Sequence, residues 1–258
     1  MARVTEVHPI AAEGYGQAAQ VYARGRPGFP PQALDWLTDD LQLKPGRFAL
    51  ELGAGTGKFT KLLAQTGAEV VAVEPVAAML ALLADDLPAV KTLRATAEDL
   101  PLGASCMDAV VCAQSFHWFA TPASLSEIRR VLKPGGLLGL TWNVRDRSVA
   151  WVEELTRIMN RYEGDAPRYD DGEWRDVFPA PGFGPLREKS VPHAHTGNAE
   201  RVIVDRVASV SFIAALPEAT RQSVLNEVRA LIAGTPELAG KSIVSMPYVT
   251  VMTSCQAG

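Results

Sequence analysis

Three glycines and a carboxylate stand within seven residues near the start of the chain, in the order Glu51-Leu-Gly53-Ala54-Gly55-Thr-Gly57. Glycine has no Cβ, so a loop of this kind can turn sharply and let its backbone approach a ligand closely. A dinucleotide-binding loop of the GxGxxG type would place its third small residue one position after Gly57, where a lysine stands. The pattern indicates a nucleotide-like ligand, and a tight strand-to-helix turn without any ligand is the alternative.

A second carboxylate, Glu74, ends the apolar run EVVAVE and follows the glycine loop by 17 residues. A carboxylate at the end of the second strand can accept two hydrogen bonds from the vicinal hydroxyls of a ribose. This chemistry suits any adenosine ligand, so Glu74 does not separate a methyl donor from NAD. A solvated charge at a strand end is the alternative interpretation.

The elements that must position these residues alternate along the first two-thirds of the chain. Short apolar runs follow segments of helical periodicity, which predicts an α/β fold: a doubly wound parallel sheet with helices on both faces. Ligands of such sheets bind at the carboxyl ends of the strands, where Glu51–Gly57 and Glu74 stand. We predict strands over residues 47–52, 69–74, 90–95, 107–114 and 137–143, and helices over residues 58–66, 76–87 and 121–132.

The last third of the chain is less regular. We predict helices over residues 149–162, 199–210 and 218–233 and strands over 186–195 and 243–253. The two late strands extend the sheet edge, and the helices between them form a small cap. Because no repeat or linker interrupts the chain, we predict a single domain. Its parts are an N-terminal helical lid (residues 1–44), a cofactor-binding core (45–145) and substrate-side helices with the last two strands (146–258).

Four segments together resemble the successive motifs of class I S-adenosylmethionine-dependent methyltransferases: Glu51–Gly57, Glu74, Thr96–Pro101 and Leu132–Gly136. They occur in the right order and spacing over residues 45–145. The stretches 22–30, 114–119 and 142–146 are further similar to a small-molecule subgroup that includes trans-aconitate methyltransferases. The resemblance implies a Rossmann-like sheet of seven strands, mostly parallel with the last strand antiparallel, and S-adenosyl-L-methionine as cofactor.

The resemblance also implies roles for the residues around the cofactor. The backbone of Gly53, Ala54, Gly55 and Gly57 would lie against its methionine and ribose parts. Glu51 would orient the amino group, and Glu74 would hold the ribose hydroxyls. The residues expected around the adenine and at the methionine end are Pro75, Val76, Ala97, Glu98 and Gln114.

His117 would stand beside the methyl group in this arrangement. Positioning can supply much of the rate of methyl transfer, and a base is needed only if the nucleophile arrives protonated. His117 is therefore a candidate general base for a hydroxyl or amine acceptor. We favour a second interpretation, in which Phe116, His117, Trp118 and Phe119 form an aromatic wall of the acceptor pocket; packing of a helix cap is a third.

Arginines on the expected acceptor side could bind an acid. Arg24, Arg26 and Arg145 are the candidates, because a guanidinium binds a carboxylate through two parallel hydrogen bonds. A surface ion pair, which contributes little stability, is an equally good interpretation of each. The remaining substrate-side candidates are Tyr15, Tyr22 and Trp142.

The amino-acid composition disfavours some classes of binding partner and some cellular locations. The net charge is −4 and no long basic run occurs, which disfavours nucleic acid. No stretch reaches the ~18 apolar residues of a membrane helix, and the first residues lack the apolar core of a signal peptide. The three cysteines form no CxxC pair, so we expect reduced thiols, a cytoplasmic protein and no bound metal. We further expect a monomer or a homodimer.

Three functions remain open. The first is a methyltransferase acting on a small organic acceptor such as an acid or a phenol. The second is an NAD-dependent oxidoreductase on the same Rossmann core, which the position of Gly57 and the segments Thr96–Pro101 and Lys133–Gly136 disfavour. The third is a non-catalytic protein that holds the cofactor, because its cofactor motifs would look the same. A shared fold does not fix the substrate.

Overall fold

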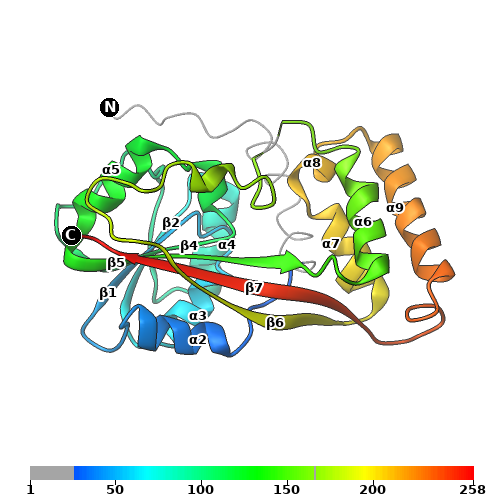
Figure 1. Ribbon diagram of the computed structural model, residues 1–258, viewed down its shortest axis with the longest axis horizontal. Coiled ribbons are helices and arrows are strands. Elements are labelled where there is room, and N and C mark those ends of the chain that lie inside the picture. The colour runs from blue at the N-terminus through cyan, green and yellow to red at the C-terminus, as the bar shows by residue number, and fades with distance from the viewer. Residues whose placement is uncertain (1–25, 166) are drawn as a thin grey trace.

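A seven-stranded sheet forms the centre of the computed structural model, which describes residues 26–165 and 167–258 (Figure 1). The strands are β1 (Phe48–Leu52), β2 (Glu69–Val73), β3 (Lys91–Leu93), β4 (Met107–Ala113), β5 (Leu132–Arg145), β6 (Arg187–Gly197) and β7 (Val244–Gln256). Their order across the sheet is β3-β2-β1-β4-β5-β7-β6.

The direction of pairing confirms the predicted doubly wound fold. Neighbouring strands from β3 through β5 pair in parallel, whereas β7 pairs antiparallel with both β5 and β6. The described sheet thus has six strands running one way and β7 running the other. The strand order reverses at β1, which lies between β2 and β4, and ligands of such sheets bind beyond the carboxyl ends of the strands at this point.

Helices cover both faces of the parallel part. One face carries α2 (Gln32–Asp35), the π-helical turn η1 (Trp36–Asp40), α3 (Thr60–Ala64) and α4 (Ala77–Asp86), and the other carries α5 (Pro122–Val131) (Figure 1). Successive side chains of a strand point to opposite faces of the sheet. Ala49 therefore packs against the helices α2 and α3, and Leu50 packs in the core on the α5 face. Both-sided burial explains why β1, β2 and β4 read as nearly continuous apolar runs.

The N-terminal segment that we predicted as a lid divides into parts. Residues 1–25 lie outside the described residues. Trp36 and Leu41 pack directly on β5: a Cβ at Gly139 would lie 2.5 Å from Leu41 Cδ1 and 2.8 Å from the Trp36 ring. Residues 32–41 are therefore part of the sheet's own core, whereas Arg26, Pro27 and Phe29 line a cavity.

Strand β5 is longer than the predicted segment 137–143. Its first residue, Leu132, pairs with Met107, so the glycine-containing turn Lys133–Gly136 lies inside the strand. The Lys133 Nζ donates to Asp108 Oδ2 at 2.7 Å, which ties this irregular start to β4. The result is a strand of 14 residues that extends beyond the parallel core together with β7.

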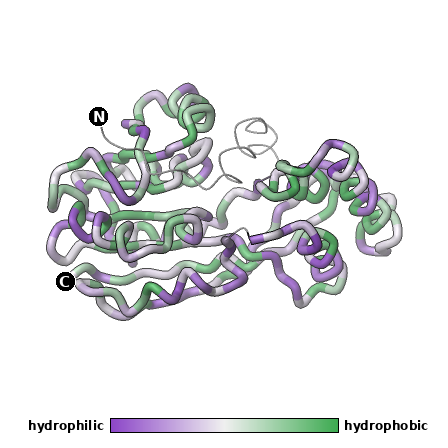
Figure 2. The backbone as a smooth tube through the Cα atoms, turned by 90° about the horizontal axis from the view of Figure 1, so that it is seen from above, coloured by the Kyte–Doolittle hydropathy of each residue, from purple (hydrophilic) through white to green (hydrophobic). Residues whose placement is uncertain are grey.

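A second group of helices packs beside the sheet and has its own apolar core, seen from two directions in Figures 1 and 2. The first residues of β7 contribute Val244, Met246 and Tyr248 to this core. The predicted helix 199–210 is split into a π-helical turn and a short α-helix. These elements are α6 (Ala150–Asn160), η4 (Glu200–Val204), α7 (Asp205–Ala208), α8 (Ser211–Ala214) and α9 (Glu218–Gly234).

Two short 3-10 helices complete the described structure, η2 (Phe116–Trp118) after β4 and η3 (Glu173–Arg175) before β6. Across residues 26–165 and 167–258, none of the helices has the length and apolar character that crossing a bilayer requires.

Candidate active site

The glycine loop turns over the carboxyl end of β2. Gly53, Gly55 and Gly57 have φ of 69°, 57° and 84°, in the left-handed region that favours glycine. The Gly53 and Ala54 N–H groups donate to the Val73 carbonyl at 2.9 and 3.0 Å. A Cβ at Gly53 would lie 2.5 Å from the Ser115 Cβ, so close packing as well as conformation requires glycine there.

Glu74 holds this loop in place. Its Oε2 accepts a hydrogen bond from the Gly55 N–H at 2.9 Å, and its Oε1 accepts one from the Val76 N–H at 2.9 Å. Burial raises the pKa of the carboxyl, and these two hydrogen bonds oppose the rise. Glu74 therefore shapes the loop, and the second lone pair of each oxygen is the part left for a ligand hydroxyl.

Glu51, at the end of β1, is a buried carboxyl that is only 1% exposed. Its Oε2 has no hydrogen-bond partner among the described residues. Burial raises the pKa of Glu51 to about 8; the nearby Thr60 hydroxyl opposes this rise, and the charge of Glu74 adds a smaller contribution to it. A cation placed against this oxygen would restore the charged form, because an opposite charge within a few ångströms favours ionisation.

A cavity of about 500 Å³, including its open mouth, lies against the glycine loop. We call it the glycine-loop cavity. Its floor is the loop and Glu51, and its opposite side comes from the segment 26–29 and from α7. The lining residues are Arg26, Pro27, Phe29, Glu51, Gly53, Ala54, Gly55, Thr56, Lys58, Phe59, Ala113, Gln114, Asn143 and Arg206.

The segment Arg26–Phe29 crosses this cavity as a strap. The Gly28 carbonyl accepts hydrogen bonds from Asn143 Nδ2 at 2.8 Å and from His193 Nε2 at 3.0 Å, and the Lys58 ammonium donates to the Arg26 carbonyl. The side-chain oxygen of Asn143 is in turn fixed by the Thr250 hydroxyl at 2.6 Å. Side chains from β5, β6 and β7 thus jointly hold the strap over the glycine loop.

The residues predicted around the adenine lie beyond β2 and β3 and line neither of the two cavities described in this section. Pro75 and Val76 are half-buried, Ala97 is buried, and Glu98 is half-buried. The Glu74 N–H donates to the Leu93 carbonyl at 3.2 Å, which brings the ends of β2 and β3 together. The predicted adenine contacts therefore stand near Glu74, on the far side of the loop from Gln114.

A second, larger cavity of about 730 Å³, including its open mouth, adjoins the first. We call it the arginine cavity. It shares Arg26, Gln114, Asn143 and Arg206 with the glycine-loop cavity, so the two form one connected site. Its lining residues are Arg26, Gln114, His117, Trp118, Trp142, Asn143, Val144, Arg145, Pro167, Arg168, Tyr169, Asp170, Arg206, Val210, Ser211 and Phe212.

Positive charge dominates the arginine cavity. Arg26, Arg145, Arg168 and Arg206 line it, against the single lining carboxylate of Asp170, an exposed residue. Arg168 pairs with Glu163 at 2.5 Å. The described residues therefore give the cavity an excess of arginines over acids.

The effect of this charge reaches neighbouring groups. Burial is the main cause that lowers the pKa of Lys58 to about 8, and the nearby positive charges of Arg26, Arg201 and Arg206 add to it. Arg206 is only 7% exposed. The Arg145 Nε donates to the Thr156 hydroxyl at 3.0 Å, and no carboxylate in residues 26–165 and 167–258 lies within 4.0 Å of its guanidinium. The half-buried charge of Arg145, which has no carboxylate nearby among the described residues, favours an anionic ligand.

His117 lines the arginine cavity and is hydrogen-bonded to a neighbouring aromatic side chain. Its Nδ1 accepts a hydrogen bond from the indole N–H of Trp142 at 3.2 Å. Burial, followed by the charges of Arg26 and Arg168, lowers the pKa of His117 to about 3. At neutral pH the ring is therefore uncharged. Its unprotonated nitrogen, Nδ1, is the atom with which a general base would accept a proton, and it already accepts the hydrogen bond from Trp142.

Most of the predicted acceptor-side residues are brought together. Arg26, His117, Trp118, Trp142 and Arg145 all line the arginine cavity. Gln114, which was predicted at the methionine end of the cofactor, lines it as well. Phe116 does not: it is fully buried, and its ring packs against those of Phe119, Trp174 and Phe178, so it is a core residue and not part of the wall. Tyr15, Tyr22 and Arg24 lie outside the described residues.

Several lining residues were not among the predicted candidates. Arg206 and Phe212 come from α7 and α8, and Arg168 and Tyr169 from the loop after α6. Their positions depend on how the second group of helices packs, which leaves no local signal in the sequence. Asn143 is different: it follows Trp142 at the end of a predicted strand, where a polar residue in a buried run could have been noticed.

Comparison with known proteins decides the family. A family model described as a methyltransferase domain matches residues 50–140. A methyltransferase of Mycobacterium tuberculosis strain H37Rv, Rv3342, whose name calls it uncharacterized, is 40% identical over 237 residues, covering 92% of this chain and 93% of that protein. This chain belongs to the methyltransferase family.

The solved structures agree at the level of the fold. The YcgJ protein of Bacillus subtilis superposes with a TM-score of 0.59 at 16% identity, covering 88% of this chain and 98% of that one. A phosphoethanolamine N-methyltransferase of Haemonchus contortus, in complex with S-adenosylhomocysteine, gives 0.59 at 14% identity, covering 100% of this chain and 61% of that one. The chain therefore has the Rossmann-like fold of methyltransferases.

Proposed function

We propose that this protein is an S-adenosylmethionine-dependent methyltransferase whose acceptor is a small organic acid. The observation that carries the cofactor assignment is the buried Glu51 Oε2, which has no hydrogen-bond partner among the described residues and belongs to a residue lining the glycine-loop cavity. The methionine moiety of the cofactor carries an ammonium group that would satisfy this oxygen. The Haemonchus structure holds the demethylated form of the same cofactor.

The proposed cofactor contacts extend beyond Glu51. The backbone of Gly53–Gly57 would lie against the methionine and ribose, and Glu74 would accept from the ribose hydroxyls with its second lone pairs. Pro75, Val76, Ala97 and Glu98 would surround the adenine, and Gln114 would line the methionine end. When bound, S-adenosylmethionine supplies a methyl group already activated on a sulfonium sulfur.

The arginine cavity supports an acid as the acceptor, in preference to a phenol. Arg145, Arg168 and Arg206 would bind carboxylate groups, since a planar guanidinium matches a carboxylate bidentately. The cavity shares Gln114 and Asn143 with the glycine-loop cavity, so an acceptor there would reach the methionine end. An acid acceptor also agrees with the resemblance to the trans-aconitate subgroup.

What these side chains contribute is mainly position. Holding two reactants in line converts a bimolecular step into an intramolecular one, which supplies much of the acceleration. The arginines orient the acceptor, and the strap Arg26–Phe29 lies over the cavity and restricts access of water. A carboxylate oxygen reaches the site as an anion, so no base is required for it to act as the nucleophile.

The test combines binding and turnover. Calorimetric titration with S-adenosylmethionine and, separately, with NAD reads the cofactor directly. We expect the methyl donor to bind and NAD not to bind. A screen of small mono- and dicarboxylic acids, phenols and amines, following formation of S-adenosylhomocysteine, then reads the acceptor. Binding of NAD alone, or of neither, contradicts the cofactor assignment, whereas donor binding without turnover on any compound favours a non-catalytic protein.

A further inference from the structure

The hydrogen bond between Trp142 and His117 determines where the histidine carries its proton. The indole N–H of tryptophan can only donate, so the His117 Nδ1 at 3.2 Å must be the acceptor. A neutral imidazole has one protonated nitrogen, and with Nδ1 unprotonated that nitrogen is Nε2. Trp142 thus selects one of the two neutral tautomers of His117.

Trp142 is held firmly enough to impose this choice. It is only 1% exposed, and β5 pairs it with Val251 of β7. Its ring lies 4.6 Å from that of Trp174 and 5.0 Å from that of Tyr169. An indole packed between two rings and a strand cannot rotate to release its hydrogen bond without disturbing the core.

Burial, together with nearby positive charge, keeps the ring of His117 neutral. Burial, then the guanidiniums of Arg26 and Arg168, lower the pKa of His117 to about 3. Arg145 and Arg206 line the same cavity, as do the phenol of Tyr169 and the exposed carboxylate of Asp170. Protonation would also place a second donor opposite the Trp142 N–H, which would break the bond.

We propose that Trp142 is a positioning residue that locks His117 in its Nε2–H tautomer, so that His117 is a fixed hydrogen-bond donor to the methyl acceptor and not a general base. This inference rests on the proposed function, which makes the arginine cavity the acceptor site. His117 lines that cavity, and its Nδ1 is engaged by Trp142, so Nε2 is its remaining polar atom.

The lock has a consequence for the class of acceptor. A fixed N–H donor stabilises an oxygen with a free lone pair, and it gives nothing to a group that must first lose a proton. A carboxylate satisfies both conditions, because it accepts hydrogen bonds and is already an anion. An ammonium acceptor would meet the Nε2–H and the arginines with its own positive charge.

The tautomer can be read without any substrate. Long-range 1H–15N correlation spectra distinguish a protonated from an unprotonated imidazole nitrogen, and with four histidines in the chain the His117→Gln variant identifies the signal. We expect Nδ1 to be unprotonated and Nε2 protonated from pH 5.5 to 8.5. A protonated Nδ1, or titration of the ring within that range, would overturn the proposal.

Matched variants separate the lock from general packing. Trp142→Phe removes the indole donor and should convert the spectrum to a mixture of tautomers, whereas Trp174→Phe, in the same ring cluster, should leave the His117 signal unchanged. Equal effects of the two variants would contradict the assignment. Folding is checked by circular dichroism, and S-adenosylhomocysteine binding is measured in each variant.

If Trp142→Phe does not fold, two replacements of His117 keep the proposal open to refutation. A glutamine amide reaches the position of Nε2 and can donate there, whereas an asparagine amide reaches only the position of Nδ1. We expect kcat/KM for the acid to fall by about 10- to 100-fold in His117→Asn and much less in His117→Gln. Equal losses would overturn the donor role. A wild-type protein that does not bind the methyl donor refutes the proposed function instead, and leaves the tautomer measurement unaffected.

Discussion

Glu74 and Gly55, 19 residues apart in the chain, are joined by a hydrogen bond of 2.9 Å from the Gly55 N–H to the Glu74 carboxylate. The same carboxylate accepts from the Val76 N–H. One side chain therefore fixes both the glycine loop and the start of α4. The residue predicted to hold a ribose is also the residue that shapes the loop beside it.

Replacing Glu74 with alanine tests both roles. We expect binding of S-adenosylhomocysteine to weaken by about 1–3 kcal/mol. The N–H groups of Gly55 and Val76 would lose their carboxylate acceptor, and the ribose hydroxyls would lose theirs. Calorimetry measures the change. Glu69→Ala, at the exposed start of the same strand, is the control and should bind normally. Unchanged affinity in folded Glu74→Ala would remove Glu74 from the ribose role.

Cofactor binding should release a proton from Glu51. The pKa of the free carboxyl is raised to about 8, chiefly by burial, so at pH 7 the group is protonated. An ammonium placed against it lowers the pKa, and the proton leaves. Binding should therefore tighten as the pH rises from about 6 to 8, by up to about tenfold per pH unit.

Calorimetry at pH 7 in two buffers of different ionisation enthalpy counts the protons released by Glu51. The variant Glu51→Gln should bind more weakly and with no such release. If proton uptake accompanied binding in the native protein, the proposed contact between Glu51 and the ammonium would be wrong.

Gly53→Ala should destabilise the fold itself. The new Cβ would lie 2.5 Å from the Ser115 Cβ, on a backbone with a φ of 69° that non-glycine residues rarely adopt. We expect the free energy of unfolding in urea to fall by about 2–4 kcal/mol. A Cβ at Gly103 meets nothing within 4 Å, so Gly103→Ala should change it by less than about 0.5 kcal/mol. Similar stability of the two variants would show that the loop relaxes freely.

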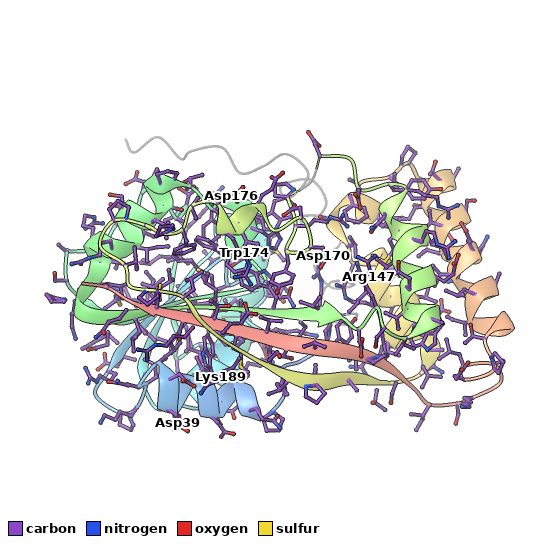
Figure 3. All side chains as sticks on the ribbon, viewed as in Figure 1. Asp39, Arg147, Asp170, Trp174, Asp176 and Lys189 are labelled. Atoms are coloured by element: carbon purple, nitrogen blue, oxygen red, sulfur yellow. The ribbon has the colours of Figure 1, made fainter. Side chains whose placement is uncertain are left out.

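Arg145→Ala should affect the acceptor and spare the cofactor. Arg145 lines the arginine cavity and not the glycine-loop cavity. Its loss should therefore lower kcat/KM for an acid, by an amount that corresponds to about 1.5–3 kcal/mol of lost transition-state stabilisation. Affinity for S-adenosylhomocysteine should stay the same. Arg147, two residues further on, pairs with Glu153 at the start of α6 and is the control (Figure 3). Equal kinetics of Arg145→Ala and wild type on the best acid would exclude Arg145 from binding it.

Sequence patterns predicted the sheet well, because its information is local. The apolar runs of β1, β2 and β4 and the glycines that follow β1 identify a strand-turn-helix unit without knowledge of distant residues. The limits of β5 were less predictable. Its irregular start depends on Lys133 reaching Asp108 across the neighbouring strand, a contact between residues 25 positions apart.

The acceptor side was predicted only in part, for a related reason. Trp142 and Arg145 lie near the carboxyl end of β5 and His117 shortly after β4, where the fold class itself directs attention. Arg206 is contributed by α7, and its place beside Gln114 follows from the packing of helices whose periodicity says nothing about their direction. The role proposed for His117 likewise depends on a partner 25 residues away, which spacing alone does not reveal.

The two longest strands have a mechanical consequence. β5 and β7, of 14 and 13 residues, pair along nine positions and continue from the sheet into the second group of helices (Figure 1). A hydrogen-bonded ribbon of this kind resists bending far more than a single connecting chain does. The lining residues contributed by the second group of helices are therefore held in a nearly fixed position relative to the glycine loop. Exchanging the helical segments between related chains should then alter the acceptor while preserving the alignment between donor and acceptor.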